Sequence, residues 1–227
     1  MSKNLVSVVM SAFNSETTIK KSLVSLLTQT YSEIEILVID DNSTDNTFEI
    51  CSDLSKKHEN LKIFRNRNNL GLTKNLNTLI NKSNGKFIAR QDADDISISN
   101  RLDMQLKYLN KYDLDGCATR AYIMGKNKII PGKSYYLPKK IVMKKKNPFI
   151  HGTLLIKSSV INEVGLYNEK FYYSQDYKLM SDLLKNNYKL KIMKEPLYHL
   201  NMEGNISIKY KKEQEYYANC VKKDINP

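Results

Sequence analysis

The chain has 227 residues, 41% hydrophobic and 26% charged, a composition typical of a globular protein that argues against extensive disorder. Lysine and arginine number 36 against 24 acidic residues, so the net charge is +12 and anionic partners such as nucleic acid, acidic membranes or phosphorylated ligands are favoured. The cysteines are too widely spaced for a disulfide framework or a zinc site, which predicts a reduced, cytoplasmic setting. No signal peptide is expected, and no apolar run approaches the roughly 18 residues that span a bilayer.

Apolar runs and helical repeats alternate through the first hundred residues. The expected strands are 5–10, 34–39, 61–64 and 86–89, and the expected helices are about 14–27, 45–58 and 72–80. This alternation predicts an α/β fold with a doubly wound, mainly parallel sheet. In such sheets ligands bind beyond the carboxyl ends of the strands, where this chain carries Asn14, Asp40, Asp41 and the acidic cluster 92–95.

The acidic cluster Asp92, Asp94 and Asp95 directly follows the apolar run 87–89. Three carboxylates within four residues repel one another unless a cation or hydrogen-bond donors compensate them. Mg²⁺ and Mn²⁺ take oxygen ligands, commonly one or two carboxylates together with substrate phosphates. The cluster therefore predicts a divalent metal site, and an acidic turn that caps the next helix is the alternative.

The second half has a different pattern. A basic segment at 139–146 fits either a solvated helix with one apolar stripe or contact with an anionic membrane. No linker rich in Gly or Ser separates the halves, so we expect one compact body. The other expected elements are a helix at 99–110, a strand at 116–124, a loop at 126–138, a strand at 153–156, a helix just after Gln175 and Asp176, a strand at 188–192 and a peripheral helix in the Lys- and Tyr-rich tail from Ile208.

Five stretches in the right order and spacing closely resemble family 2 glycosyltransferases: 6–14, 37–45, 69–71, 85–95 and 101–102. The resemblance implies a single GT-A domain over residues 1–227. Its Rossmann-like nucleotide-binding half would take about residues 1–97, merged with a smaller, mixed acceptor half of about 98–227. It also implies a hexosyltransferase that moves a sugar from a nucleotide diphosphate donor to an acceptor hydroxyl with inversion, and a UDP-sugar is the favoured donor.

Asp41 matches the family carboxylate that binds the donor base. A carboxylate accepts but cannot donate, which suits the N3–H of uracil; the alternative is an acid placed at a helix N-terminus. By the same resemblance Ala12, Phe13 and Asn14 line the nucleotide pocket, and Lys74 lies near the base or the phosphates.

Asp92, Ala93 and Asp94 match the DxD motif. The resemblance implies that Asp94 contacts Mn²⁺ or Mg²⁺ directly, while Asp92 lies near the ribose or binds the metal through water, and that Ala93 belongs to the nucleotide site. The metal would neutralise charge on the departing diphosphate. Asp95 either belongs to this site or caps the following helix. Arg101 is expected to be a structural partner of the acids.

Asp176 falls where the family carries its general base, which takes the proton from the acceptor hydroxyl; a helix N-cap is the alternative. Gln175 replaces the usual Glu of that pair and is a candidate acceptor or sugar contact. His151 is a second candidate contact, with a packed, hydrogen-bonded histidine as the alternative. His199 and Glu203 are given no role.

The expected process is bacterial surface polysaccharide synthesis, with a glycan or lipid-linked saccharide as acceptor. The positive charge fits peripheral contact with an anionic membrane at the inner face of the plasma membrane. A sugar nucleotidyltransferase is disfavoured because residues 11–14 lack glycine. A non-catalytic binder of anionic polymers would use the lysines and tyrosines at 209–217, but the carboxylates in the loops repel a phosphate backbone, so no nucleic acid is expected.

Overall fold

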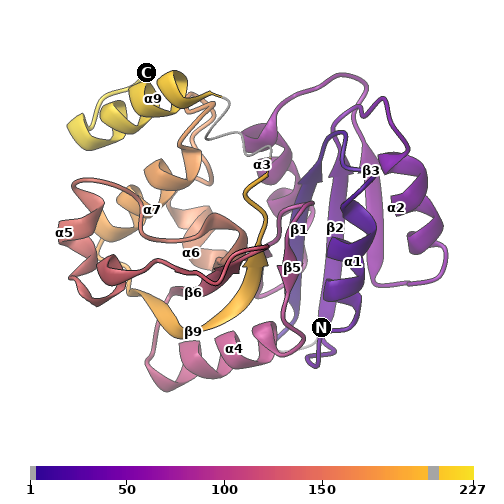
Figure 1. The fold of residues 1–227 in the computed structure, drawn as a ribbon, viewed down its shortest axis with the longest axis horizontal. Helices are drawn as coiled ribbons and strands as arrows, with labels where there is room; N and C mark the ends of the chain where they lie inside the picture. Colours follow the sequence, from indigo (N-terminus) through magenta and orange to yellow (C-terminus); the bar gives the residue numbers. More distant parts are fainter. Residues whose placement is uncertain (1–3, 204–209) are drawn as a thin grey trace.

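The computed structural model describes residues 4–203 and 210–227. Across this part of the chain, nine strands form one sheet that runs through both halves of the sequence, with helices packed along it (Figure 1). The central path of the sheet has the order β3-β2-β1-β4-β8-β6-β9-β5, and β7 pairs with β6.

The first half is a parallel sheet with crossover helices. Its strands pair in parallel because a helix between each strand and the next returns the chain to the same end of the sheet. The strands are β1 (Val6–Ala12), β2 (Ile34–Asp40), β3 (Leu61–Arg65) and β4 (Phe87–Arg90), and the helices are α1 (Ile19–Leu27), α2 (Thr47–Ser55) and α3 (Leu72–Lys82).

The second half continues the sheet with strands of both directions. β8 is antiparallel to β4 and β6, whereas β6 and β9 are parallel. The elements are β5 (Ile96–Ser97), α4 (Arg101–Lys111), β6 (Gly116–Ile123), β7 (Ile129–Ile130), η1 (Lys133–Tyr136), α5 (Lys139–Met143), η2 (His151–Thr153), β8 (Leu155–Lys157), α6 (Ser158–Glu163), α7 (Gln175–Lys185), β9 (Leu190–Leu200) and α9 (Lys211–Lys223).

The two faces of the sheet are buried in two separate cores. Side chains that alternate along a strand point to opposite faces, so Val9 packs with α3, α6 and α7 while Val8 packs with α1 and α4. This burial on both faces explains why the strands of the first half are continuous apolar runs in the sequence. Because β1, β2 and β4 are parallel, their carboxyl ends lie at the same edge of the sheet.

The predicted α/β class, with a mainly parallel half merged into a mixed half, is confirmed. Several boundaries differ. The helix expected from residue 14 begins at Ile19, because residues 15–18 first form a turn in which the Thr18 N–H donates to the Ser15 carbonyl at 3.0 Å. The loop expected at 126–138 contains β7 and η1, and the sequence patterns missed β5 and α6. Ile208, where the tail helix was expected to begin, lies outside the described residues, and α9 begins at Lys211.

Cys51, Cys117 and Cys220 are buried and unpaired, as the spacing predicts. Within residues 4–203 and 210–227, no helix is both long enough and apolar enough to span a bilayer.

Candidate active site

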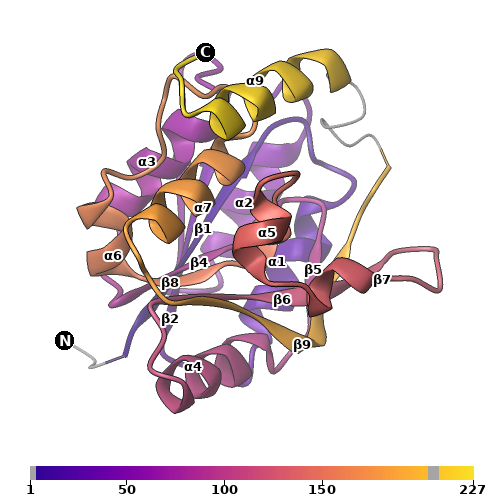
Figure 2. The same ribbon diagram turned by 90° about the vertical axis from the view of Figure 1, so that its left-hand side faces the viewer.

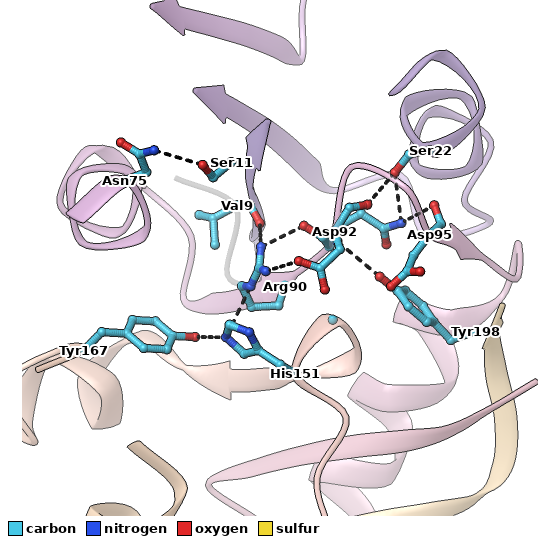
Figure 3. A network of polar contacts seen from close by, with 12 residues as sticks. Val9, Ser11, Ser22, Asn75, Arg90, Asp92, Asp95, His151, Tyr167 and Tyr198 are labelled. Carbon is cyan, nitrogen blue, oxygen red and sulfur yellow. Dashed lines mark hydrogen bonds and ion pairs between the residues drawn. The ribbon is translucent and has the colours of Figure 1, made fainter. Parts of the chain in front are cut away.

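The acidic loop 91–95 follows β4 and is fixed by side chains that carry no motif signal. The Gln91 amide donates to the Ser22 hydroxyl at 3.1 Å and to the Asp95 carbonyl at 2.9 Å. Ser22, on α1, donates in turn to the Asp92 carbonyl at 2.8 Å (Figure 3). The loop is therefore held against α1 by its backbone, which leaves its carboxylates available for other contacts.

Arg90 is the cation that compensates the acidic loop. Its side chain is only 1% exposed, and its guanidinium forms an ion pair with the Asp92 carboxylate. The same group donates to the carbonyls of Val9 and Gln91 at 3.1 and 2.7 Å. A buried arginine bound this way fixes the position of the Asp92 carboxylate (Figure 3).

Arg101 was expected to be a structural partner of these acids, but among the described residues it forms no ion pair with them. The residue is fully buried, and its guanidinium donates to the main-chain carbonyls of Arg90 and Gly152 at 3.2 and 3.4 Å. It also lies 5.5 Å from the centre of the Tyr198 ring. The guanidinium of Arg101 thus interacts with carbonyl groups and with an aromatic face, whereas Arg90 lies beside Asp92.

Neither Asp94 nor Asp95 forms an ion pair within the part of the chain that the structure describes. Burial, and then the charge of Asp92, raises the pKa of Asp94 to about 6. Burial and the neighbouring carboxylates raise the pKa of Asp95 to about 8, although it accepts the Asn201 N–H at 2.6 Å. Asp95 therefore fixes the end of β9, and it does not cap α4, which begins at Arg101 with Asn100 as its N-cap.

The acidic loop fits a divalent cation, although within residues 4–203 and 210–227 no cluster of three or more metal-ligating side chains is present. Arg90 engages Oδ1 of Asp92, and the raised pKa of Asp94 shows that its negative charge is incompletely compensated. Hard cations often take only one or two carboxylates and complete their shell with phosphates and water. Asp94 and the second oxygen of Asp92 are the atoms that would supply those ligands.

A cleft of about 900 Å³ lies beside the acidic loop. Its lining includes the predicted metal, base and contact residues from both halves of the chain: Asp92, Asp94, His151, Gln175 and Asp176. These residues come from the end of β4, from η2 and from the first turn of α7. The structure thus brings to one cleft side chains that lie more than 80 positions apart in the sequence.

His151 is part of a buried network with Arg90. Its Nε2 lies 2.7 Å from the Tyr167 hydroxyl and accepts from Arg90 Nε at 3.4 Å (Figure 3). Burial and the charge of Arg90 lower the pKa of His151 to about 3, so the ring is neutral at physiological pH. This arrangement matches the packed-histidine alternative, while the position on the cleft wall leaves a contact with substrate as a prediction.

Asp176 is the second residue of α7 and faces the cleft. Its Oδ2 accepts a hydrogen bond from the Asn147 amide at 2.7 Å. Burial raises the pKa of Asp176, while Asn147 and the backbone N–H groups of the first helical turn act in the opposite direction. The N-cap residue of α7 is Ser174, so Asp176 is not the N-cap that the alternative proposed. It is a partly buried carboxylate that Asn147 orients at the cleft.

The predicted nucleotide-binding residues lie at the ends of β1 and β2. The Asp41 N–H donates to the Ala12 carbonyl at 2.8 Å, and the Thr44 N–H donates to the Asn14 side-chain carbonyl at 2.9 Å. Phe13 is 49% exposed at the same place. The loops after the two strands are therefore tied together and present one surface, while Lys74 is exposed on α3.

Asp41 is 3% exposed and already holds the loop before α3. Its carboxylate accepts from the Asn66 amide at 2.8 Å and from the N–H groups of Leu70 and Gly71 at 2.9 Å each. A carboxylate offers about four acceptor positions, so one position, on Oδ2, is left for a further donor. Sequence patterns missed Asn66, which lies 25 positions from its partner.

Gly71 joins the Asp41 region to the cleft. Its φ is +84°, and a Cβ at this position would lie 2.9 Å from the Tyr172 ring, so glycine is required on both counts. Tyr172 and Leu72 line the cleft. The loop that Asp41 holds therefore leads to the cleft wall, although the predicted nucleotide-binding residues are outside the lining of the cleft itself: Ala12, Phe13, Asn14, Asp41 and Lys74.

Comparison with known proteins identifies the chain. The family model described as glycosyl transferase family 2 matches residues 7–165. The chain belongs to glycosyltransferase family 2. Among its relatives, this glycosyltransferase is 32% identical over 226 residues to an uncharacterized glycosyltransferase of Methanocaldococcus jannaschii, covering 95% of this chain and 78% of the relative. It is 35% identical over 191 residues to the Escherichia coli UDP-Glc:α-D-GlcNAc-diphosphoundecaprenol β-1,3-glucosyltransferase, covering 82% and 72%.

Solved structures confirm the GT-A fold of this glycosyltransferase. Residues 1–349 of S. aureus TarS, in complex with UDP, superpose with a TM-score of 0.76 at 20% identity, over 96% of this chain and 64% of that chain. A mannosyltransferase from Pyrobaculum calidifontis, in complex with GDP-Man and Mn²⁺, has a TM-score of 0.78 at 17% identity, over 98% and 65%. The chain thus spans just under two thirds of the length of these structural neighbours.

Proposed function

We propose that this glycosyltransferase moves a sugar, with inversion, from a nucleoside diphosphate sugar to a hydroxyl of a glycan or lipid-linked saccharide. The observation that carries the proposal is the cleft that Asp94 of the nucleotide half and Asp176 of the acceptor half both line. A UDP-sugar is favoured because the E. coli relative is named for UDP-Glc, and TarS has been crystallised with UDP and with UDP-GlcNAc.

Asp176 would accept the proton of the acceptor hydroxyl as its oxygen bonds to the anomeric carbon. The bond from that carbon to the diphosphate oxygen breaks on the opposite face, so the configuration inverts. Asn147 holds the Asp176 carboxylate through Oδ2, which orients it toward the cleft where the acceptor hydroxyl would lie. The raised pKa of Asp176 makes it a stronger base than an exposed aspartate.

Asp94 and the second oxygen of Asp92 would hold Mn²⁺ or Mg²⁺, a cation that neutralises charge on a departing diphosphate. Arg90 fixes Asp92 in this role through their ion pair. Asp41 and the surface formed by Ala12, Phe13, Asn14 and Ala93 would receive the nucleotide, and Lys74 would approach its base or phosphates. The P. calidifontis neighbour, with GDP-Man and Mn²⁺, supports metal use in this fold.

The proposed process is bacterial surface polysaccharide synthesis. The enzyme would act on its acceptor at the cytoplasmic face of the membrane, in peripheral contact with anionic lipid. The E. coli relative, whose name includes a diphosphoundecaprenol acceptor, and the net charge of +12 support it. The test is a transfer assay with α-linked UDP-glucose and UDP-GlcNAc, Mn²⁺ and a GlcNAc-diphosphate-lipid acceptor, with the product analysed by NMR. A β-linked product supports the proposal; an α-linked product would overturn the inverting mechanism.

A further inference from the structure

A second hollow, of about 350 Å³, lies between α5, α7 and α9. These three helices lie together at the end of the molecule remote from α1 and α2 (Figures 1 and 2). The hollow is lined by apolar groups of Met143, Leu184 and Val221, one from each helix. We refer to it as the α5–α7–α9 groove.

Lysines surround the groove. Lys140, Lys144, Lys185 and Lys222 line it, and none of the acidic residues that the structure describes does so. Lys185 is paired with Asp224, whereas Lys140 and Lys144 have no carboxylate within 4.0 Å among the described residues. The groove therefore combines an apolar floor with a positive rim that a carboxylate compensates only at Lys185 among the described residues.

The groove adjoins the candidate active site. Tyr177 and Lys222 line both hollows, and the Tyr177 hydroxyl donates to the Met143 carbonyl, so this ring forms the wall between them. Asp176, which directly precedes Tyr177 in α7, faces the cleft. Lys145 and Lys146 line the cleft directly after Lys144 of the groove. A row of lysines thus runs from the proposed base to the apolar floor.

The chemistry of the groove favours an anionic amphiphile. Inorganic phosphate would use the lysines but leave the floor in contact with water, and a neutral hydrocarbon would leave the lysines unpaired. An occupant with a phosphate next to a hydrocarbon chain satisfies both. Because the cleft holds the reacting hydroxyl in the proposed function, the phosphate of such a molecule would lie at Lys144, Lys145 and Lys222.

We propose that the α5–α7–α9 groove binds the hydrocarbon chain of a lipid-linked acceptor, with its phosphate on the lysines between groove and cleft. The proposal rests on the proposed function and names the part of the acceptor that lies beyond the sugar. It assigns to this chain a lipid-binding site built from side chains of three helices, distinct from the DxD loop and from the base.

The test uses calorimetry on the full chain with dodecyl phosphate below its micelle concentration, compared with inorganic phosphate and dodecyl maltoside. We expect dodecyl phosphate to bind at least tenfold more tightly than either comparison ligand. Ser181→Trp, which fills the groove, and Lys222→Glu, which reverses charge at the junction, should each weaken it at least tenfold. Lys20→Glu, an exposed lysine on α1, should leave it unchanged.

Unchanged dodecyl phosphate affinity in both groove variants overturns the proposal, as does inorganic phosphate binding equally well. If Ser181→Trp fails to fold, as judged by circular dichroism, the exposed Lys222→Glu decides. The unmodified chain could instead sediment with phosphatidylglycerol vesicles, lose this in Ser181→Trp, and fail to bind monomeric dodecyl phosphate. That result overturns the proposal in favour of a bilayer phospholipid as the occupant of the groove. Mn²⁺-dependent UDP binding by the unmodified chain separates the two levels: its absence contradicts the proposed function, and its presence without amphiphile binding contradicts only the groove.

Discussion

Among the described residues, Arg90 is the cation that pairs with the acidic loop, and it pairs with Asp92. Burial and then the neighbouring carboxylates raise the pKa values of Asp94 and Asp95, to about 6 and about 8. A motif predicts that these carboxylates occur together, but not which of them is compensated. That distinction depends on Arg90 and on the Asn201 N–H, and Asn201 is 106 positions away from Asp95.

The raised pKa of Asp94 predicts a pH dependence of metal-assisted binding. Below pH 6 a proton occupies the carboxylate that the metal requires, so the gain in UDP affinity from Mn²⁺ should fall by about tenfold per pH unit. Calorimetric titrations of UDP with and without Mn²⁺ at about pH 5 and about pH 7.5 measure this gain. The effect on stability has the opposite sign, because a raised carboxyl pKa favours the folded chain at low pH and that contribution is lost as pH rises through about 6.

The control for this pH dependence is Asp94→Asn, which should show no gain from Mn²⁺ at either pH. A gain that persists in Asp94→Asn, or one that is independent of pH, would show that the metal binds elsewhere.

Asp176→Asn should reduce transfer by about 10²–10⁴-fold, because an amide cannot accept the proton of the acceptor hydroxyl. UDP affinity in the presence of Mn²⁺ should be retained, because Asp176 contacts Asn147 rather than the acidic loop. Single-turnover transfer and calorimetry measure the two quantities. Asp182→Asn makes the same change on the same helix, in an ion pair with Lys178, and should transfer normally. Transfer at the unmodified rate by Asp176→Asn would remove it from the mechanism.

The elements that hold the site could largely be predicted, but the contacts between them could not. Continuous apolar runs locate β1, β2 and β4, because strands buried on both faces need such residues. β5 has only two residues and α6 only six, too short for any period to be visible. Asn147, which orients Asp176, lies in the connection after α5, where no pattern marks it.

The loop between β3 and α3 is the element whose geometry links the base-binding region to the cleft. Gly71→Ala should destabilise the chain by about 1–3 kcal/mol through its φ of +84° and its contact with Tyr172. It should also weaken UDP binding, because the Gly71 N–H is one of the donors that fix Asp41. Urea unfolding and calorimetry measure the two effects.

Gly125→Ala is the matched control for this loop, since its φ of +68° carries similar strain while nothing lies within 4 Å of the added methyl group. It should destabilise less than Gly71→Ala and leave UDP binding unchanged. Removing the Tyr172 ring in Gly71→Ala/Tyr172→Ala should recover the difference. Equal losses in the two alanine variants would contradict the role assigned to the Tyr172 contact.

On the scale of the whole molecule, the halves are joined by one sheet, and the cleft lies where their loops meet. The sequence predicts the fold class and has a net charge of +12, but it does not predict which lysines lie together on the surface. Lys144, Lys145, Lys211 and Lys222 come from the α5 region and from α9, and only tertiary packing brings them to the two hollows. These lysines therefore lie where the phosphate of the proposed acceptor would lie.

The most direct test of the donor site is thermal unfolding of the chain with UDP, GDP, dTDP and CDP, each with Mn²⁺ and with EDTA. A ligand that binds only the folded chain raises its stability by about 2.7 kcal/mol at a hundredfold excess over Kd, which is readily measured as a shift in Tm. We predict a shift with UDP that is lost in EDTA and absent in Asp94→Asn. The absence of a shift with every nucleotide, or a UDP shift unaffected by EDTA and by Asp94→Asn, would contradict a metal-assisted donor site on the acidic loop.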